Sequence, residues 1–275
     1  MFRSRLCASL VLTFACFAAA APARAQALFP DKNLEAVIRD VLKKGEKDPL
    51  AEGDLKNVYI VKGKGKSIAD LTGLEKCTNI AELHLPGNQI KDLKALSALV
   101  NCQSLDLSGN QIADLAPLAP LVKLQYLKLD NNQVENLAPL KDLTKLTALY
   151  LEKNKIKSVE PLGGLVKLAS LYLDENQIAD IAPLKTVKFL SSLGLKQNQI
   201  ADVTPLADMT ELRYTFLEGN KVADLTAIVA MAKKDAEGDK RFAPYWNLYL
   251  AGNPLSDAAK AQLEELKKLG VRVMF

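Results

Sequence analysis

Leu124 to Val134 reads LQYLKLDNNQV, and Leu168 to Ile178 reads LASLYLDENQI. Both stretches follow the pattern L-x-x-L-x-L-x-x-N-x-I/V. The asparagine of this pattern returns every 22 residues and then once more after 33, at Asn88, Asn110, Asn132, Asn154, Asn176, Asn198, Asn220 and Asn253. Because one spacing governs most of the chain, the fold must be an array of similar units.

The spacing within each unit predicts its local structure. In L-x-L, alternate side chains point to opposite faces of a short strand, so the leucines enter the core and the x positions face outward. The asparagine amide both donates and accepts, and it can therefore satisfy backbone groups of a tight bend. This is the leucine-rich repeat pattern. We expect an α/β solenoid with a parallel sheet on one side and short turns of 3₁₀ character on the other.

The residue four positions after each asparagine is of a type that caps helices. These residues are Asp92, Asp114, Asn136, Ser158, Asp180, Asp202 and Asp224. A proline follows three positions later in five units, at Pro117, Pro139, Pro161, Pro183 and Pro205. Proline fixes its own φ, which suits a short 3₁₀ turn after the cap. Capping therefore accounts for the row of carboxylates, which we do not take as evidence for acid–base chemistry.

The chain divides into four segments along its length. Residues 1–25 have the composition of a secretory signal peptide, with Arg3 and Arg5 at the start, an apolar run over 6–21 and a small-x-small site at Ala23-Arg24-Ala25. Cleavage after Ala27 is the second choice, and an uncleaved anchor is the alternative. Residues 26–57 form an N-terminal helical cap, residues 58–255 form one degenerate and eight consensus coils, and residues 256–275 form a C-terminal cap of a helix and a strand. An isolated coil buries too little to fold alone, so both caps are needed.

Composition and charge exclude several classes of protein. The 275 residues are 49% hydrophobic and 25% charged, which is globular composition and not that of a disordered tail. Removal of the signal leaves 33 basic and 32 acidic residues, a balance that argues against nucleic-acid binding. Two cysteines remain after the signal, Cys77 and Cys102, either as buried thiols or as a bridge between neighbouring coils.

Aromatic residues concentrate at the outward positions of the predicted strands. One group comprises Tyr126, Tyr150 and Tyr172, from consecutive coils, and a second comprises Tyr214, Phe216, Trp246 and Tyr249. Exposed tyrosine and tryptophan beside charges are typical of protein-binding hot spots. We therefore predict that these seven residues bind a ligand, although aromatic residues also favour strands for structural reasons alone.

A partial row of carboxylates lies beside the aromatic positions. It comprises Asp130, Glu152, Asp174 and Glu218, which we assign as a secondary site. The alternatives are a solvated face partly paired with Lys128 and Lys153, or a calcium site; we predict no metal and no cofactor. The chain has a single histidine, His84, with no Ser or Cys beside it in the sequence, and no nucleophile, dinucleotide or metal motif. We predict that it is not an enzyme.

An insertion of 11 residues near 229–244 interrupts the repeat. The segment 225–235 is expected to be a longer helix, and residues 236–244 a loop. Long loops in regular solenoids often mark a binding face. The other interpretation is a tolerated insertion in which Phe242 packs under the loop.

The repeat resembles that of bacterial internalin-like proteins. The resemblance rests on the 22-residue unit, on NQIADLAPL at Asn110–Leu118, and on Asn33-Leu34-Glu35 followed by Ile38-Arg39. It implies a curved arc with the sheet on its concave face, exported to the periplasm, the cell envelope or the medium, that binds another macromolecule. We expect a monomer without a membrane span after signal cleavage, recognising a protein or peptide. Glycan or cell-wall binding and a purely structural envelope role are the alternatives.

Overall fold

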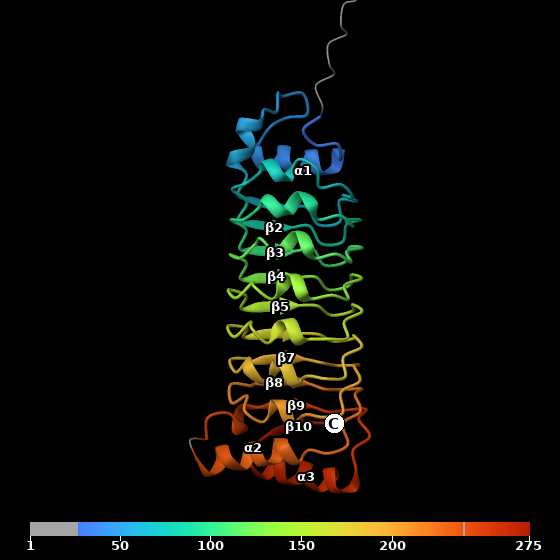
Figure 1. Ribbon diagram of the computed structural model, residues 1–275, viewed down its shortest axis with the longest axis vertical. Helices are drawn as coiled ribbons and strands as arrows, with labels where there is room; N and C mark the ends of the chain where they lie inside the picture. Colours follow the sequence, from blue (N-terminus) through green and yellow to red (C-terminus); the bar gives the residue numbers. More distant parts are fainter. Residues whose placement is uncertain (1–26, 239) are drawn as a thin grey trace, which may run out of the picture.

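The computed structural model describes residues 27–238 and 240–275. The predicted signal peptide, residues 1–25, lies outside this range. Within the described ranges, no helix combines the length and the apolar character that crossing a bilayer requires. The chain forms one solenoid of stacked coils, with the N-terminal helix at one end and two further helices at the other (Figure 1).

One side of the solenoid is a parallel sheet in which every strand pairs with the strands of the coils before and after it. Over the described residues the sheet contains ten strands, in sequence order. The strands are β1 (Ile60–Lys62), β2 (Glu82–His84), β3 (Ser104–Asp106), β4 (Tyr126–Lys128), β5 (Ala148–Tyr150), β6 (Ser170–Tyr172), β7 (Ser192–Gly194), β8 (Tyr214–Phe216), β9 (Asn247–Tyr249) and β10 (Arg272–Met274). Their register places equivalent repeat positions opposite each other, as in Tyr150 opposite Tyr172. The expected parallel solenoid is thus confirmed.

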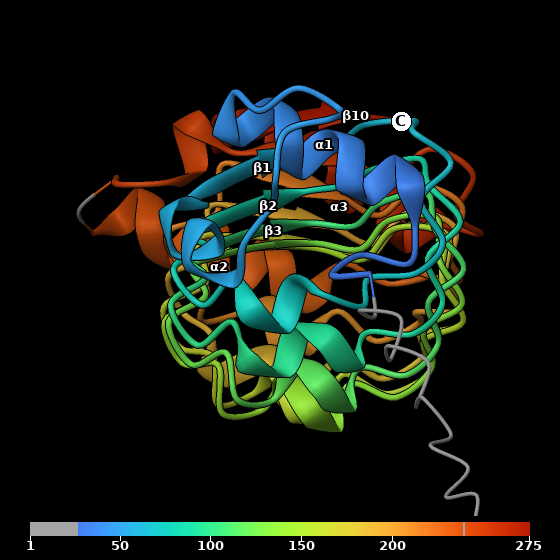
Figure 2. The same cartoon turned by 90° about the horizontal axis from the view of Figure 1, so that it is seen from above.

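The side opposite the sheet is built of 3₁₀ turns. The view from above separates these turns clearly from the strands (Figure 2). These turns are η2 (Leu74–Lys76), η3 (Lys94–Ala98), η4 (Ala116–Leu118), η5 (Ala138–Leu140), η6 (Glu160–Leu162), η7 (Ala182–Thr186) and η8 (Thr204–Leu206). Two further 3₁₀ turns, η1 (Glu52–Asn57) and η9 (Ala243–Tyr245), come just before strands β1 and β9. Each predicted capping residue accepts a bond from the backbone N–H two residues later; Asp114 Oδ1, for example, accepts from Ala116 at 2.8 Å. The contact is an Asx turn, one residue ahead of the formal N-cap.

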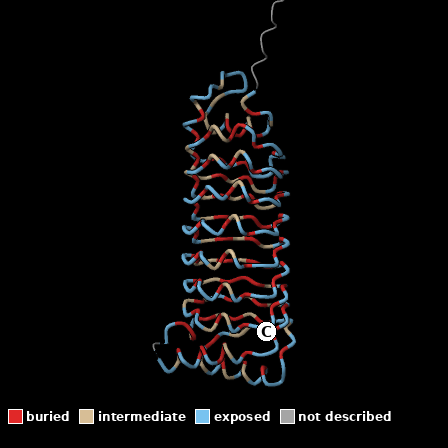
Figure 3. Tube along the Cα trace, in the orientation of Figure 1, coloured by how far each residue is buried: buried red, intermediate tan, exposed pale blue. Residues whose placement is uncertain are grey.

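The repeated asparagines bond each coil to the next. The Asn154 side-chain oxygen accepts from the Val134 backbone N–H of the preceding coil at 3.0 Å. Its amide group donates to the carbonyls of Leu129, in the preceding coil, and Leu151, in its own, at 3.0 and 3.1 Å. The same contacts recur from Asn110 to Asn220, whose side chains are nearly inaccessible to solvent. Leucine and isoleucine fill the space inside the coils, so burial alternates along the trace (Figure 3).

Helices close both ends of the solenoid. Helix α1 (Lys32–Leu42) packs against β1 through buried Leu34 and Ile38, and its N-cap, Asp31, also accepts from the backbone N–H groups of Ala69 and Asp70 in the first coil. Helix α3 (Asp257–Lys268), capped by Ser256, packs against β10 at the other end. The two end strands, β1 and β10, each contain three residues.

The insertion forms helix α2 (Thr226–Glu237) and a loop that is fixed by hydrogen bonds and by packing. The Asp235 carboxylate accepts from the backbone N–H groups of Arg241 and Ala243, both at 2.9 Å. Phe242 is fully buried, as the second interpretation of the insertion predicted. The loop is therefore packed onto the solenoid through a buried carboxylate and an aromatic ring.

The two cysteines are free, buried thiols and form no bridge. Each occupies a core position where most other coils have leucine, and burial raises the pKa of both thiols to about 12. Both act as small apolar side chains, because a thiol with so high a pKa holds almost no thiolate at neutral pH.

The asparagine contacts give a direct stability prediction. Asn154→Ala leaves the Val134 N–H and two carbonyls buried without their partner, and we expect the free energy of unfolding to fall by about 3 kcal/mol. Asn136→Ala is the matched control, because this exposed asparagine makes one bond to Ala138, and its loss should be about 1 kcal/mol. Urea unfolding measures both. Equal losses in the two variants would show that the stacked asparagines are not what joins the coils.

Candidate functional site

Six aromatic side chains form one continuous line of rings across the open face of the sheet. We call this line the aromatic strip; its members are Tyr126, Tyr150, Tyr172, Tyr214, Phe216 and Tyr249. Tyr150 and Tyr172 are stacked, with 5.3 Å between ring centroids and 7° between planes. Phe216 and Tyr249 are 4.6 Å apart at the other end. The strip is half-buried to exposed, which leaves a broad apolar surface with polar phenol edges.

Gly194 joins the two aromatic groups that the sequence placed separately. It occupies the position between Tyr172 and Phe216 in the register, and without a side chain there the two rings approach to 6.2 Å. A Cβ at this position would lie 2.6 Å from Tyr172 Cδ1 and 2.9 Å from the Asp174 carboxylate. The sequence showed this glycine in the column of outward positions, but the spacing alone did not indicate that the neighbouring rings close over it.

Two lysines lie over rings of the strip. Lys128 Nζ is 5.3 Å from the Tyr150 centroid, and Lys196 Nζ is 4.7 Å from the Phe216 centroid. Each lysine also pairs with a carboxylate of the acidic row: Lys128 with Asp130 at 3.3 Å and Lys196 with Glu218 at 3.0 Å. Of the two pairings in the alternative interpretation, the one with Lys128 is confirmed, and the one with Lys153 is wrong, because Lys153 pairs with Glu175 instead.

Two of the four carboxylates of the acidic row are far less solvated than the alternative interpretation assumed. Asp130 and Asp174 are 5% and 9% exposed. Asp130 Oδ1 accepts from the Glu152 backbone N–H at 2.9 Å, and Asp174 Oδ1 accepts from the Lys196 backbone N–H at 2.6 Å. These bonds satisfy backbone donors just beyond the strand ends, so both aspartates have a structural role as well as a charge. Among the described residues, no cluster of three or more His, Cys, Asp or Glu has the arrangement of a metal site.

Burial also shifts the titration of this row. Loss of solvent raises the pKa of Asp174 to about 6, with further repulsion from Glu152 and Glu218. The pKa values of Asp130 and Glu152 are raised for the same main reason. A raised pKa shows that the protein holds negative charge here at a cost in stability, which is a common property of binding sites.

Trp246 does not belong to the exposed face, and the prediction that it does is wrong. The residue is fully buried, its indole N–H donates to Thr215 Oγ1 at 2.9 Å, and its ring packs against Phe242. Thr215 occupies the inward strand position at which the other consensus coils have leucine. This smaller, hydroxylated residue gives the indole both space and an acceptor. A threonine at a leucine position was therefore the feature of the sequence that could have indicated a buried Trp246.

His84 has a serine neighbour that the sequence did not reveal. Its Nε2 lies 2.9 Å from Ser104 Oγ on the adjacent strand. Asp106, opposite His84 in the register, instead accepts from the backbone and hydroxyl of Ser108. The pair therefore lies on an open strand surface, with its nearest aspartate engaged elsewhere.

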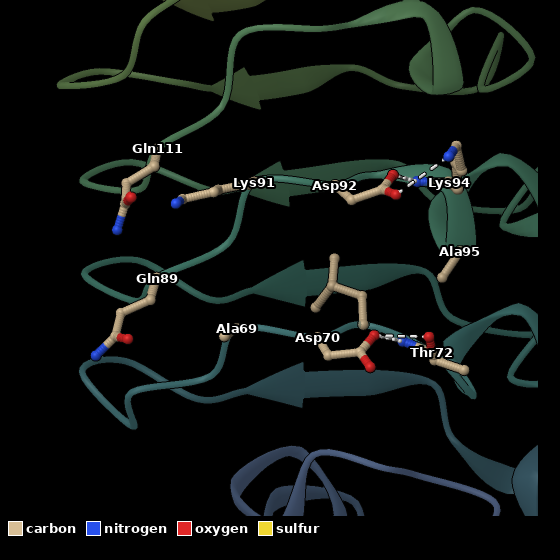
Figure 4. Close-up of a pocket in the computed structure, with 10 residues that line it drawn as sticks. Ala69, Asp70, Thr72, Gln89, Lys91, Asp92, Lys94, Ala95 and Gln111 are labelled. Carbon is tan, nitrogen blue, oxygen red and sulfur yellow. Dashed lines mark hydrogen bonds and ion pairs between the residues drawn. The ribbon is translucent and has the colours of Figure 1, made fainter.

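A second concave region is a polar groove of about 550 Å³ along the turns of the first coils (Figure 4). Its acidic side chains serve their own turns: Asp70 accepts from the backbone and hydroxyl of Thr72, and Asp92 accepts from the backbone of Lys94. The groove shares no residue with the aromatic strip, and both of its carboxylates bond within their own turns.

Comparison with known proteins agrees with this architecture. The family model described as "Leucine Rich repeats (2 copies)" matches residues 100–142 and 144–186. An internalin (inlF) from Listeria monocytogenes is 30% identical, with a TM-score of 0.79 over 90% of this chain and 69% of that chain. Internalin C2 (inlC2) from the same organism is also 30% identical, with a TM-score of 0.72 over 74% of this chain and 91% of that one.

The protein is thus a bacterial-type leucine-rich repeat protein, a class whose solenoids generally bind proteins or peptides. More narrowly, the chain belongs to the internalin family. The ectodomain of a plant membrane receptor kinase from Arabidopsis thaliana shares the fold at 22% identity, with a TM-score of 0.58 over 68% of this chain and 23% of that one. The search by sequence among curated proteins finds no match.

The pKa of Asp174 predicts a pH-dependent difference in stability. Because the folded state binds this proton more tightly than the unfolded chain, the stabilisation is complete below about pH 4 and is lost as pH rises through about 6. Asp174→Asn keeps an oxygen for the Lys196 N–H but carries no charge. Its unfolding free energy relative to the wild type should therefore rise by about 2 kcal/mol between pH 4 and pH 7.

Urea unfolding of both proteins at a series of pH values measures this difference. Asp92→Asn is the control, because that carboxylate is exposed on the opposite side and bonds only within its own turn. A difference between wild type and Asp174→Asn that stays constant from pH 4 to pH 7 would contradict the assignment.

Proposed function

We propose that this protein is an exported, non-catalytic binding module that recognises a protein or peptide through the aromatic strip. The observation that carries the proposal is the strip itself: six rings in mutual contact on an open sheet, bordered by two lysines and four carboxylates. Rigid aromatic residues with charged neighbours supply most of the binding energy at protein interfaces. Because the rings pack on each other, little side-chain freedom is lost when a partner binds.

Further features support the remaining parts of this proposal. The basic, apolar and small-x-small order of residues 1–25 supports export. Helices α1 and α3 cover the two ends of the solenoid, which favours a monomer. The continuous, open strip suits an extended partner better than a small substrate, which usually needs an enclosing pocket.

The proposal is tested with a triple variant of the strip, Tyr150→Ala, Tyr172→Ala and Phe216→Ala. A control variant with the same change in composition is Tyr59→Ala, Tyr245→Ala and Phe189→Ala, whose side chains are 54%, 58% and 66% exposed outside the strip. Each protein is used as bait for envelope and secreted fractions of the source cell, and its fold is checked by circular dichroism. We expect one protein to be retained by the wild type and the control variant, and lost by the strip variant.

Retention of that protein by all three baits would contradict the proposed surface and direct attention to the insertion or the turn side. Glycan binding is the second candidate, because tyrosine rings also stack on sugars. Glycan binding is favoured instead if no protein is retained, and if the wild type binds peptidoglycan or a glycan array while the strip variant does not.

A further inference from the structure

The strip contains three places where an aromatic ring lies beside carboxylates of the acidic row. At two of them a lysine of the chain completes the group. Lys128 lies over Tyr150 and pairs with Asp130, and Lys196 lies over Phe216 and pairs with Glu218. The fold thus builds the same arrangement twice: a cation that faces a ring and touches a carboxylate, which is a favourable geometry for a partly desolvated positive charge.

The third place has the ring and the carboxylates but no cation from the chain. Tyr172 is adjacent to Glu152 and Asp174, the residues that correspond in the repeat to Lys196 and Glu218 around Phe216. Within 27–238 and 240–275, no side-chain nitrogen of Lys, Arg or His lies within 4.0 Å of either carboxylate, and no cation lies over the Tyr172 ring. Lys128 and Lys153 act on Glu152, and Lys196 on Asp174, from a greater distance. We call these three residues the Tyr172 pocket.

The Asp174 carboxylate of the Tyr172 pocket is held in place. Asp174 is 9% exposed and leans over Gly194, where its carboxylate would contact any added Cβ. One of its oxygens accepts from the Lys196 backbone N–H, and the other makes no hydrogen bond within the described residues. The Glu152 carboxylate makes neither a hydrogen bond nor an ion pair within the described residues. The ring is therefore flanked by two carboxylates that together accept only one hydrogen bond. Burial and the mutual repulsion of these charges raise the pKa of Asp174, and the positive charge of an incoming cation would offset this cost.

We propose that the Tyr172 pocket binds an arginine side chain of the protein partner. The inference rests on the proposed function, since it names the chemistry that one part of the strip recognises. Arginine fits better than lysine because the planar guanidinium stacks on a ring and also donates to two acceptors at once. Lys128 and Lys196 show that the same face accommodates a cation about 5 Å from a ring centroid.

Glu152→Lys provides the decisive variant. It places a lysine at the position of Lys196 in its own coil, next to Tyr172 and Asp174, and so reproduces the Lys196, Phe216 and Glu218 arrangement. The new lysine should occupy the place beside Tyr172 and Asp174 that we assign to the partner's arginine, and so exclude it. Glu135→Lys is the matched control, with the same change in net charge at an exposed position that faces away from the strip.

The probe is a Gly-Arg-Gly peptide with blocked ends, titrated into the full chain and followed by NMR at the Tyr172 ring and the Gly194 amide. Its lysine and citrulline counterparts are titrated in parallel. We expect the arginine peptide to bind at least tenfold more tightly than the citrulline peptide, which has the same shape without the charge. Glu152→Lys should weaken binding at least tenfold, and Glu135→Lys should leave it within twofold.

Equal binding of the arginine and citrulline peptides, or equal weakening by the two charge-reversal variants, would overturn the proposal. If Glu152→Lys unfolds, Glu152→Gln replaces it, with an expected loss of about fivefold. The two levels of inference separate cleanly. A partner that needs the strip but is retained equally by Glu152→Lys contradicts the arginine pocket alone, whereas an arginine-selective pocket in a chain whose partner ignores the strip contradicts the proposed function.

Discussion

The structure depends on one repeated interaction, the buried asparagine side chain that bonds one coil to the coil before it. The Asn132 amide illustrates it: its oxygen accepts from Ile112 of the preceding coil, and its nitrogen donates to Leu107 of that coil and to Leu129 of its own. Three buried backbone groups are satisfied by one side chain. A coil shifted by a single residue would lose all three bonds and turn its leucines outward, so the register of the sheet is strongly fixed.

Fixed register determines what the surface presents. Strands that are only three residues long contribute two outward side chains each, and a single strand offers no binding surface. Stacking in register brings rings from different coils into contact, 5.3 Å apart for Tyr150 and Tyr172. The same stacking places Glu152 beside Asp174, whose pKa is raised mainly by burial and further by repulsion from Glu152. The asparagines therefore stabilise a surface that retains unfavourable charge, as functional surfaces commonly do.

Much of this architecture could be predicted from the sequence, because a period of 22 residues fixes both the fold and the column in which each residue lies. The capping residues, the core positions of the two cysteines and the aromatic columns follow from position alone. What position does not give is the direction of a side chain. Trp246 turns inward because Thr215 replaces a leucine and accepts its indole N–H. Tyr172 reaches Phe216 because Gly194 leaves the space between them.

The charged residues show the same limit. The sequence placed Asp130 and Asp174 in one row, but each turns back to bond the next coil's backbone, which buries it. Lys128 and Lys196 reach rings and carboxylates at once, and such contacts depend on the distance between coils and on rotamers. The repeat in the sequence specifies which residues are neighbours. The contacts between those neighbours depend on side-chain size, as at Gly194, where the lack of a side chain lets two rings meet.

The account's central claim is that the asparagine bonds hold the coils in register and so preorganise the aromatic strip. Native-state hydrogen exchange of the amides that donate to the asparagines tests it most directly, at Val134, Ile156 and Ile178. The account predicts that these turn amides exchange as slowly as the central strand amides, through unfolding of whole coils. Exchange at the rate of exposed loop amides, while the strands remain protected, would show that the turns open independently and would contradict the claim.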